Sequence, residues 1–108
     1  MSFLPNAQNV HIDSPKLTYL LTNPKKAGFF IHHGFEPSRP QELDAALRAH
    51  PIQNQIENTF HTVHGEKYTV RCTMPSPDGR NPCTFTVWIV DPGQGIARFV
   101  TGYASPFP

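Results

Sequence analysis

Apolar residues change their spacing once along this chain, and that change limits the folds the chain can adopt. Through His50 they recur every three or four residues, which is the period of a helix that buries one face. From Ile56 onward they alternate with polar residues, which is the period of a strand with one solvated face. A helical part followed by strands predicts an α+β fold, in which two or three N-terminal helices pack on a curved antiparallel sheet of about four strands.

The helical part contains three segments with recognisable boundaries. In the clearest one, residues 38–50, Ser38 is a capping residue and Pro51 ends the helix. Residues 25–33 predict a shorter helix, because a glycine follows directly and favours a helix end. A short apolar segment, residues 16–21, follows residues that suit a helix start, with a proline in the first turn.

The strand part divides at turn residues into segments that we expect to pair with one another. After a first stretch that begins at Ile56, the predicted strands are residues 67–74, 83–90 and about 96–103. In the 83–90 strand, alternation assigns to the core Phe85, Val87 and Ile89, and to the opposite face Thr84, Thr86 and Trp88. The last strand has two mixed faces, as expected of a strand that borders a site.

The length of 108 residues predicts a single domain over residues 1–108, because a chain of this size forms one core. Within it we expect an extended arm over residues 1–14, a helical part over 15–50 and an antiparallel sheet over 56–105. No apolar run approaches the length of a membrane span, and the start of the chain lacks the basic and apolar regions of an export signal. We therefore expect no membrane association and a cytoplasmic location.

Charge is sparse and nearly balanced along the chain. Charged residues make up 16% of it, and the formal net charge is +1 with the histidines neutral. Strong non-specific binding to nucleic acid needs many lysines and arginines against phosphates, so we expect no DNA binding, although a local site for one phosphate is compatible with this charge. Two cysteines without ordered histidines do not predict a zinc site, and we expect neither a metal nor a cofactor.

Short motifs along the chain resemble a family of small bacterial domains that is uncharacterised. The family pattern combines a KAxFF helix, a DGRNP turn, a TVWI strand and a closing VTAYP strand. The matching residues are Lys26–Ala27, Phe29–Phe30, Gly34–Phe35, Asp78–Pro82, Thr86–Ile89, Arg98 and Val100–Tyr103. The resemblance covers about residues 12 to 105, and the order and spacing of the motifs are more specific than any single motif.

That family is similar to the C-terminal toxin domains of contact-dependent inhibition and other polymorphic toxins. Those domains have the barnase, EndoU, colicin and RelE-like fold, with helices before a curved antiparallel sheet, and many are metal-independent ribonucleases. The resemblance therefore implies a ribonuclease-like toxin domain with its site on the exposed face of the sheet. It also implies RNA as the substrate and a small antitoxin or immunity-like protein as the partner.

Metal-free cleavage of RNA begins when a 2′-hydroxyl attacks the adjacent phosphate, and it needs a base, an acid and groups that stabilise the phosphate. The candidate catalytic residues are Lys26, Arg98, Thr101 and Tyr103. Strand alternation places Arg98 on the face opposite Thr101 and Tyr103, unless a bulge or sheet curvature redirects one of them. The structural alternative for Arg98 is an ion pair with Asp91 or Glu66, and that for Tyr103 is an aromatic ring at the sheet edge.

Four further residues are candidates for substrate binding, namely His33, Arg80, Thr86 and Trp88. An exposed indole can stack on a base, and a guanidinium can hold a phosphate. Each candidate also has a structural alternative, such as half-buried packing for Trp88, a helix-end contact for His33 and a bridge between turn carbonyls for Arg80. For Lys26 the alternative is a solvated side chain.

The sequence leaves more than one function open. The first is the ribonuclease-like toxin domain, and the second is a catalytically inactive relative that acts as a protein-binding adaptor. The low net charge, the short segment between Asn23–Pro24 and Lys26 and the lack of an evident acid–base pair favour the second. A third reading is a structural part of a larger assembly, which an exposed apolar patch around Phe29, Phe35 and Phe60 would favour.

Overall fold

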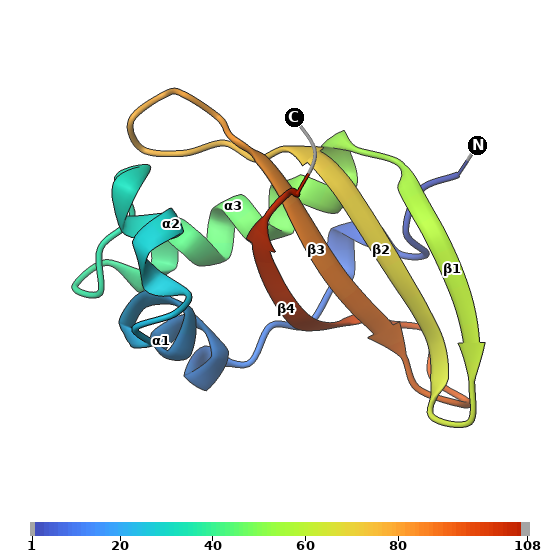
Figure 1. The fold of residues 1–108 in the computed structure, drawn as a ribbon. Helices are drawn as coiled ribbons and strands as arrows, with labels where there is room; N and C mark the ends of the chain where they lie inside the picture. Colours follow the sequence, from blue (N-terminus) through green and yellow to red (C-terminus); the bar gives the residue numbers. More distant parts are fainter. Residues whose placement is uncertain (1, 107–108) are drawn as a thin grey trace.

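The computed structural model describes residues 2–106 (Figure 1). Within them a short N-terminal segment precedes three α-helices and four β-strands. The elements are the 3₁₀ turn η1 (Ala7–Asn9), α1 (Ser14–Thr22), α2 (Ala27–His32), α3 (Pro40–Gln53), β1 (Ile56–Thr62), β2 (Gly65–Thr73), β3 (Cys83–Val90) and β4 (Arg98–Ala104). This order of helices and strands confirms the predicted α+β fold. None of the described helices is both long and apolar enough to cross a membrane.

The four strands form one antiparallel sheet in the order β1-β2-β3-β4, so strands that are consecutive in sequence pair with each other. Figure 1 shows α3 behind the sheet and α1 and α2 beside β4, so no described helix covers the side of the sheet that faces the viewer. We call this side the open face, and it carries the side chains of Lys67, Phe85, Val87, Thr101 and Tyr103. The opposite side is the core face.

Both boundaries of α3 differ from the prediction. Arg39 rather than Ser38 is the residue before the first turn, and no side chain caps the helix there. The helix also continues past Pro51 to Gln53, although a proline inside a helix removes one N–H hydrogen bond and crowds the preceding turn. Asn54 stabilises the last turn, since its backbone and side-chain N–H groups each donate to the carbonyl of His50 at 3.0 Å.

The N-terminal arm also differs from the extended segment expected over residues 1–14. Leu4, Val10 and Ile12 are buried, and the 3₁₀ turn η1 interrupts the extended backbone. The guanidinium of Arg48 in α3 donates to the carbonyl of Val10 at 2.7 Å, which fixes the arm against the helix. A small domain buries only a limited apolar area when it folds. The buried side chains of the arm enlarge the core that the helices and the sheet form.

The core lies between the core face of the sheet and the helices. Trp88 of β3 and Phe99 of β4 pack edge to face, with ring centroids 5.3 Å apart. The helices and the other strands add the buried residues Leu20, Leu21, Phe30, Phe35, Leu43, Leu47, Val70 and Met74. Phe35 is only 1% exposed and Phe29 packs against the core, so these rings do not form a surface patch with the exposed Phe60.

The two faces of β3 are the reverse of the prediction. Burial is complete for Thr84, Thr86 and Trp88, which lie on the core face. The open face instead carries the apolar side chains of Phe85, Val87 and Ile89, and Val87 is buried beneath its neighbours. Alternation therefore predicted the strand correctly and its orientation wrongly.

A chain of hydrogen bonds allows these polar groups to lie in the core. The indole N–H of Trp88 donates to the hydroxyl of Thr86 at 2.9 Å, and this hydroxyl lies 2.9 Å from Nδ1 of His50. Nε2 of His50 lies 2.9 Å from the carbonyl of Cys72. A carbonyl only accepts, so Nε2 carries the proton and Nδ1 accepts from Thr86. Because each of these polar groups has a hydrogen-bond partner, burying them carries only a small penalty in folding free energy.

Candidate active site on the open face of the sheet

A β-bulge in β4 determines which side chains meet on the open face. Thr101 pairs with Val87 whereas Phe99 pairs with Trp88, so Val100 is an extra residue in β4 without an opposite residue in β3. Residues paired directly across antiparallel strands point to the same face. Thr101 therefore shares the open face with Val87, and Phe99 shares the core face with Trp88.

The bulge also brings Arg98 to the face of Thr101 and Tyr103. Arg98 pairs with Ile89 and Tyr103 pairs with Phe85, and both of these partners lie on the open face. Regular alternation would have separated Arg98 from the other two residues, as the sequence predicts in the absence of a bulge. Three of the four predicted catalytic residues thus form one row along β4.

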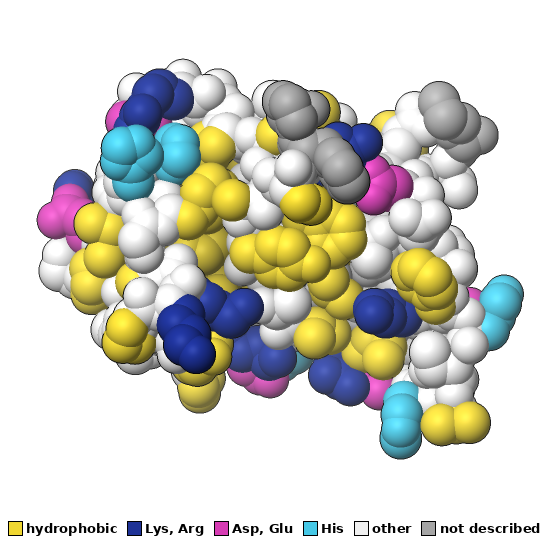
Figure 2. All heavy atoms as spheres, in the orientation of Figure 1, with side chains coloured by type: hydrophobic (Ala, Val, Ile, Leu, Met, Phe, Trp, Pro, Cys, Tyr) yellow, Lys and Arg dark blue, Asp and Glu magenta, His cyan; other side chains and the backbone are white. Residues whose placement is uncertain are grey.

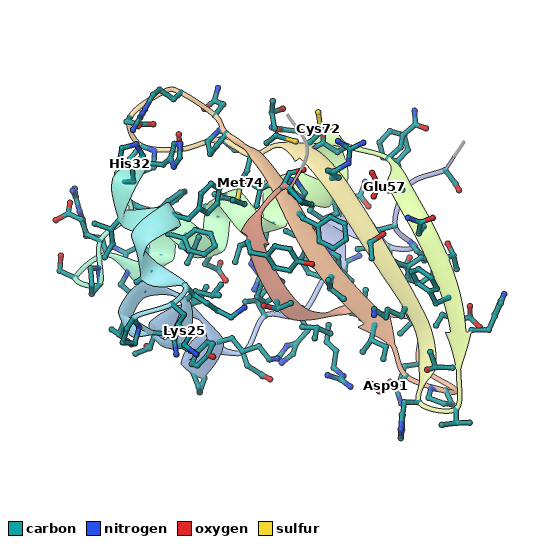
Figure 3. The ribbon with its side chains drawn as sticks, in the orientation of Figure 1. Lys25, His32, Glu57, Cys72, Met74 and Asp91 are labelled. Carbon is teal, nitrogen blue, oxygen red and sulfur yellow. The ribbon has the colours of Figure 1, made fainter. Side chains whose placement is uncertain are left out.

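Lys26, the fourth predicted catalytic residue, reaches this row from the segment between α1 and α2. Its Nζ donates to Oγ1 of Thr101 at 3.3 Å and lies 5.6 Å from the ring centroid of Tyr103. The Tyr103 ring in turn contacts that of Phe85, with centroids 5.2 Å apart, and the tyrosine is 40% exposed. Figure 3 labels the preceding residue, Lys25, which is exposed beside α1. The ammonium of Lys26 is therefore held over two hydroxyl-bearing side chains.

Arg98 is held at the start of β4 by an ion pair. Its Nε and one terminal nitrogen donate to the two carboxylate oxygens of Asp91, at 2.8 and 3.2 Å. The hydrogen bond with Asp91 raises the pKa of Arg98, and the bond with Arg98 lowers the pKa of Asp91. Of the two partners that the sequence offered, Glu66 pairs instead with His61. A guanidinium has five N–H donors, so two bonds to Asp91 leave donors for a phosphate.

The four residues predicted to bind substrate do not join this row. Thr86 and Trp88 are buried on the core face, where Trp88 donates a hydrogen bond to Thr86, so neither side chain reaches the open face. His33 lies just after α2, and its Nδ1 is 2.8 Å from the carbonyl of Phe29. This contact is the helix-end role that was the structural alternative for His33.

Arg80 lies in the turn between β2 and β3, which packs against the end of α2. It donates to Asp78 at 2.5 Å and to the carbonyl of His32 at 2.6 Å, so it bridges the turn and the helix. Hydrogen bonds from Ser76 and from Arg80 hold the pKa of Asp78 below its usual range. Figure 3 shows His32 at one end of the molecule and Asp91 at the other, so this turn is remote from Arg98 and its ion pair.

The open face combines apolar surface with positive charge. Figure 2 shows hydrophobic side chains across its middle and lysine or arginine side chains around them. Arg71, like Arg98, forms an ion pair, in this case with Glu57. Lys67 lies over the ring of Phe60, with its Nζ 5.4 Å from the centroid. Ammonium groups attract phosphates and exposed rings stack on bases, so such a surface suits a single nucleic-acid strand.

Among residues 2–106, no group of three His, Cys, Asp or Glu side chains is arranged to hold a metal ion.

Two residues that the sequence analysis did not single out also lie beside β4. Lys16 of α1 donates to the carbonyl of Val100 at 2.9 Å and so stabilises the bulge. His11 of the arm forms an isolated parallel bridge with Arg98. Apolar and polar residues alternate over residues 10–13, and this short period-two pattern was the sign in the sequence that the arm contains a strand-like segment.

Comparison with known proteins gives a family and a structural neighbour. A family model described as a domain of unknown function, DUF6883, matches residues 3–106, and the chain belongs to this family. No curated protein matches the sequence. Among solved structures, the fold is similar to a chain of the contact-dependent growth inhibition toxin–immunity protein complex from Klebsiella pneumoniae 342. The TM-score is 0.60 at 16% identity, over 85% of this chain and 96% of that chain, which establishes a shared fold.

Proposed function

We propose that this chain is a metal-independent ribonuclease-like toxin domain that cleaves RNA on the open face of its sheet. The observation that carries the proposal is the contact of Lys26 with Thr101 and Tyr103, in one row with Arg98. Lys26 sets one cation beside two hydroxyl-bearing side chains, and Arg98 adds a second cation in the same row along β4, so the row offers a phosphate both charge and hydrogen-bond donors. The fold shared with a chain of a toxin–immunity protein complex supports a toxin-like or immunity-like domain, of which the proposal takes the first.

The reaction follows from the chemistry of these side chains. The 2′-oxygen of a nucleotide attacks the adjacent phosphorus, and the bond from phosphorus to the 5′-oxygen breaks, which leaves a 2′,3′-cyclic phosphate and a 5′-hydroxyl. Lys26 and Arg98 stabilise the negative charge on the phosphate, and the hydroxyl of Thr101 donates to a non-bridging oxygen. Tyr103 gives its phenolic proton to the departing 5′-oxygen. The ammonium of Lys26 near the ring then stabilises the phenolate.

Substrate, partner and location follow from this proposal. The nucleophile is a 2′-hydroxyl, so the substrate is RNA, and DNA is not cleaved. A toxic ribonuclease needs an inhibitor in the cell that makes it, so the proposed partner is a small antitoxin or immunity-like protein that covers the open face. The cytoplasm, where RNA is abundant, remains the predicted location.

A second candidate is an inactive relative that binds a partner protein through the same face. It is favoured by the apolar side chains that Phe85, Ile89 and Tyr103 present there, and by the formal net charge of only +1. A partner that buried these side chains would need no cleavage chemistry. In that case Lys26 and Arg98 would serve as polar contacts at the rim of an interface.

The test is incubation of the purified protein with total RNA in EDTA. We expect fragments that end in 2′,3′-cyclic phosphates, and a loss of activity of at least about 100-fold in Lys26→Met, Thr101→Ala and Tyr103→Phe variants. Lys25→Met is the matched control, because it removes a neighbouring lysine that is exposed beside α1. Thermal melts of every variant show whether the fold is retained.

Two results would contradict the proposal. If the wild-type protein leaves RNA intact over a wide range of concentration and pH, the inactive, partner-binding relative becomes the better description. If the protein cleaves RNA but Lys26→Met and Lys25→Met retain the same activity, the cleavage site lies elsewhere.

A further inference from the structure

The proposed site contains cations and an acid, but it lacks a group that removes the proton from the 2′-hydroxyl. His11 is a candidate for this role, because it lies beside Arg98 at one end of the row. The backbone N–H of His11 donates to the carbonyl of Ala97 at 2.9 Å, and the N–H of Phe99 donates to the carbonyl of His11 at 2.8 Å. These two bonds flank Arg98 and make a parallel bridge between Arg98 and His11. Paired residues share a face of the sheet, so the imidazole projects from the open face beside Arg98.

Asp13 orients this imidazole. Its carboxylate lies 2.7 Å from Nε2 of His11, and both side chains are exposed to solvent. A carboxylate accepts hydrogen bonds, so Nε2 is the protonated nitrogen and Nδ1 is left as the basic one. The charged groups next to the ring are therefore Asp13 from the arm and Arg98 from β4, with Asp91 paired to Arg98. This arrangement of a histidine and a carboxylate is typical of a positioned proton acceptor.

The spacing along β4 places His11 and Tyr103 on opposite sides of Thr101. Residues on one face of a strand are about 7 Å apart when they are two positions apart. The bulge makes Arg98 and Thr101 neighbours of this kind, and Thr101 and Tyr103 are neighbours as well. A phosphate bound at Thr101 therefore has the histidine beside Arg98 on one side and the tyrosine on the other. In-line displacement requires this geometry, because the attacking and departing oxygens lie on opposite sides of phosphorus.

We propose that His11 is the general base of the cleavage site and that Asp13 is its positioning residue, an inference that rests on the proposed ribonuclease function. Nδ1 of His11 takes the proton of the 2′-hydroxyl as its oxygen bonds to phosphorus. The 5′-oxygen leaves with the proton of Tyr103, so one proton enters the protein and one leaves it. Hydrolysis of the cyclic phosphate, or proton exchange with water, restores both groups.

The experiment compares His11→Gln with His61→Gln in the 108-residue chain. His61 is the matched control, because it is also an exposed histidine paired with a carboxylate, Glu66 at 2.6 Å, but it lies at the far edge of the sheet on β1. Cleavage of a short synthetic RNA is measured as a function of pH, and thermal melts report folding. We expect His11→Gln to lower kcat by about 10²–10⁴-fold with a small change in KM, and to abolish the fall in rate toward acidic pH. Asp13→Asn should also lower kcat, by a smaller factor and again with a small change in KM.

The outcomes distinguish a failure of the role of His11 from a failure of the ribonuclease function itself. Cleavage by the wild-type protein and His61→Gln, with the loss described for His11→Gln, supports the role of His11. If both histidine variants cleave like the wild type, His11 is not the base, but the ribonuclease function stands. If folded wild-type protein cleaves no RNA, the ribonuclease function fails and the role of His11 fails with it.

Discussion

His50 should make the stability of the folded protein depend on pH near neutrality. It lies fully buried, and burial lowers the pKa of its imidazole below the ordinary value of 6.5, although the backbone carbonyls of Cys72 and Thr84 offset part of this effect. Protonation would place a charge in the core. It would also turn Nδ1 from an acceptor into a donor, so the hydroxyl hydrogen of Thr86 would lose its partner.

The sign of the effect follows from the lowered pKa. The unfolded chain binds a proton at His50 as the pH falls through 6.5, and the folded chain does not until the pH is lower. Acid therefore favours unfolding, and the stability that neutral His50 contributes is complete above this window and decreases below it. Between pH 7.5 and 5.5 the free energy of unfolding should fall by about 1.4 kcal/mol, provided that His50 stays neutral in the folded protein over this range. If the free energy of unfolding falls by about 1 kcal/mol per molar urea, the midpoint of unfolding should fall by about 1.4 M over this pH range.

Urea unfolding at several pH values measures this effect. His50→Leu should be less stable than the wild type at every pH but should lose the dependence between pH 7.5 and 5.5. His64→Gln is the control, because His64 is exposed at the β1–β2 turn and should leave the dependence unchanged. Asp78 and Asp91 have lowered pKa values, so the stability that they contribute is lost only below their ordinary pKa of 3.8. They therefore do not change the pH dependence measured between pH 7.5 and 5.5. An equal pH dependence in His50→Leu and the wild type would refute the reasoning.

Two further predictions concern packing and the bulge. Leu47 is fully buried in α3, so Leu47→Ala should lower the free energy of unfolding by about 2–5 kcal/mol in urea titrations, and a nearly neutral result would contradict the proposed helix packing. Lys16→Met should lower it by about 1 kcal/mol, because the carbonyl of Val100 loses its donor, whereas Lys25→Met should have no measurable effect; equal melting temperatures for the two variants would show that Lys16 does not stabilise the bulge.

The sequence predicted the elements of the fold better than their orientation. The strand over residues 83–90 agrees with β3 residue for residue, because period-two alternation is a local property of the chain. Alternation identifies two faces without saying which of them is buried. That choice depended on His50, which lies 36 residues before Thr86 and supplies the acceptor for its hydroxyl. A polar set such as Thr86 and Trp88 becomes a core set only when a partner from another element completes its hydrogen bonds.

The candidate site shows the same limit. Lys26, Thr101 and Tyr103 carry motifs of the resemblance, and the structure brings them into contact. His11 could not be assigned, because its place beside Arg98 depends on the arm folding back to the start of β4. Pairing between segments so far apart in sequence leaves little trace in local composition.

The burial pattern of β4 requires the bulge. Phe99 is buried in the core, and Gly102 also lies on the core face, where an added Cβ would be 3.4 Å from the ring of Phe99. Two core positions three residues apart cannot both occur in a regular strand, so one extra residue must lie between them. Without it, Arg98 would share the face of Gly102 and bury its charge, at a cost that Asp91 could not offset from the other side of the sheet. The irregularity that completes the candidate site is therefore also what keeps a guanidinium out of the core.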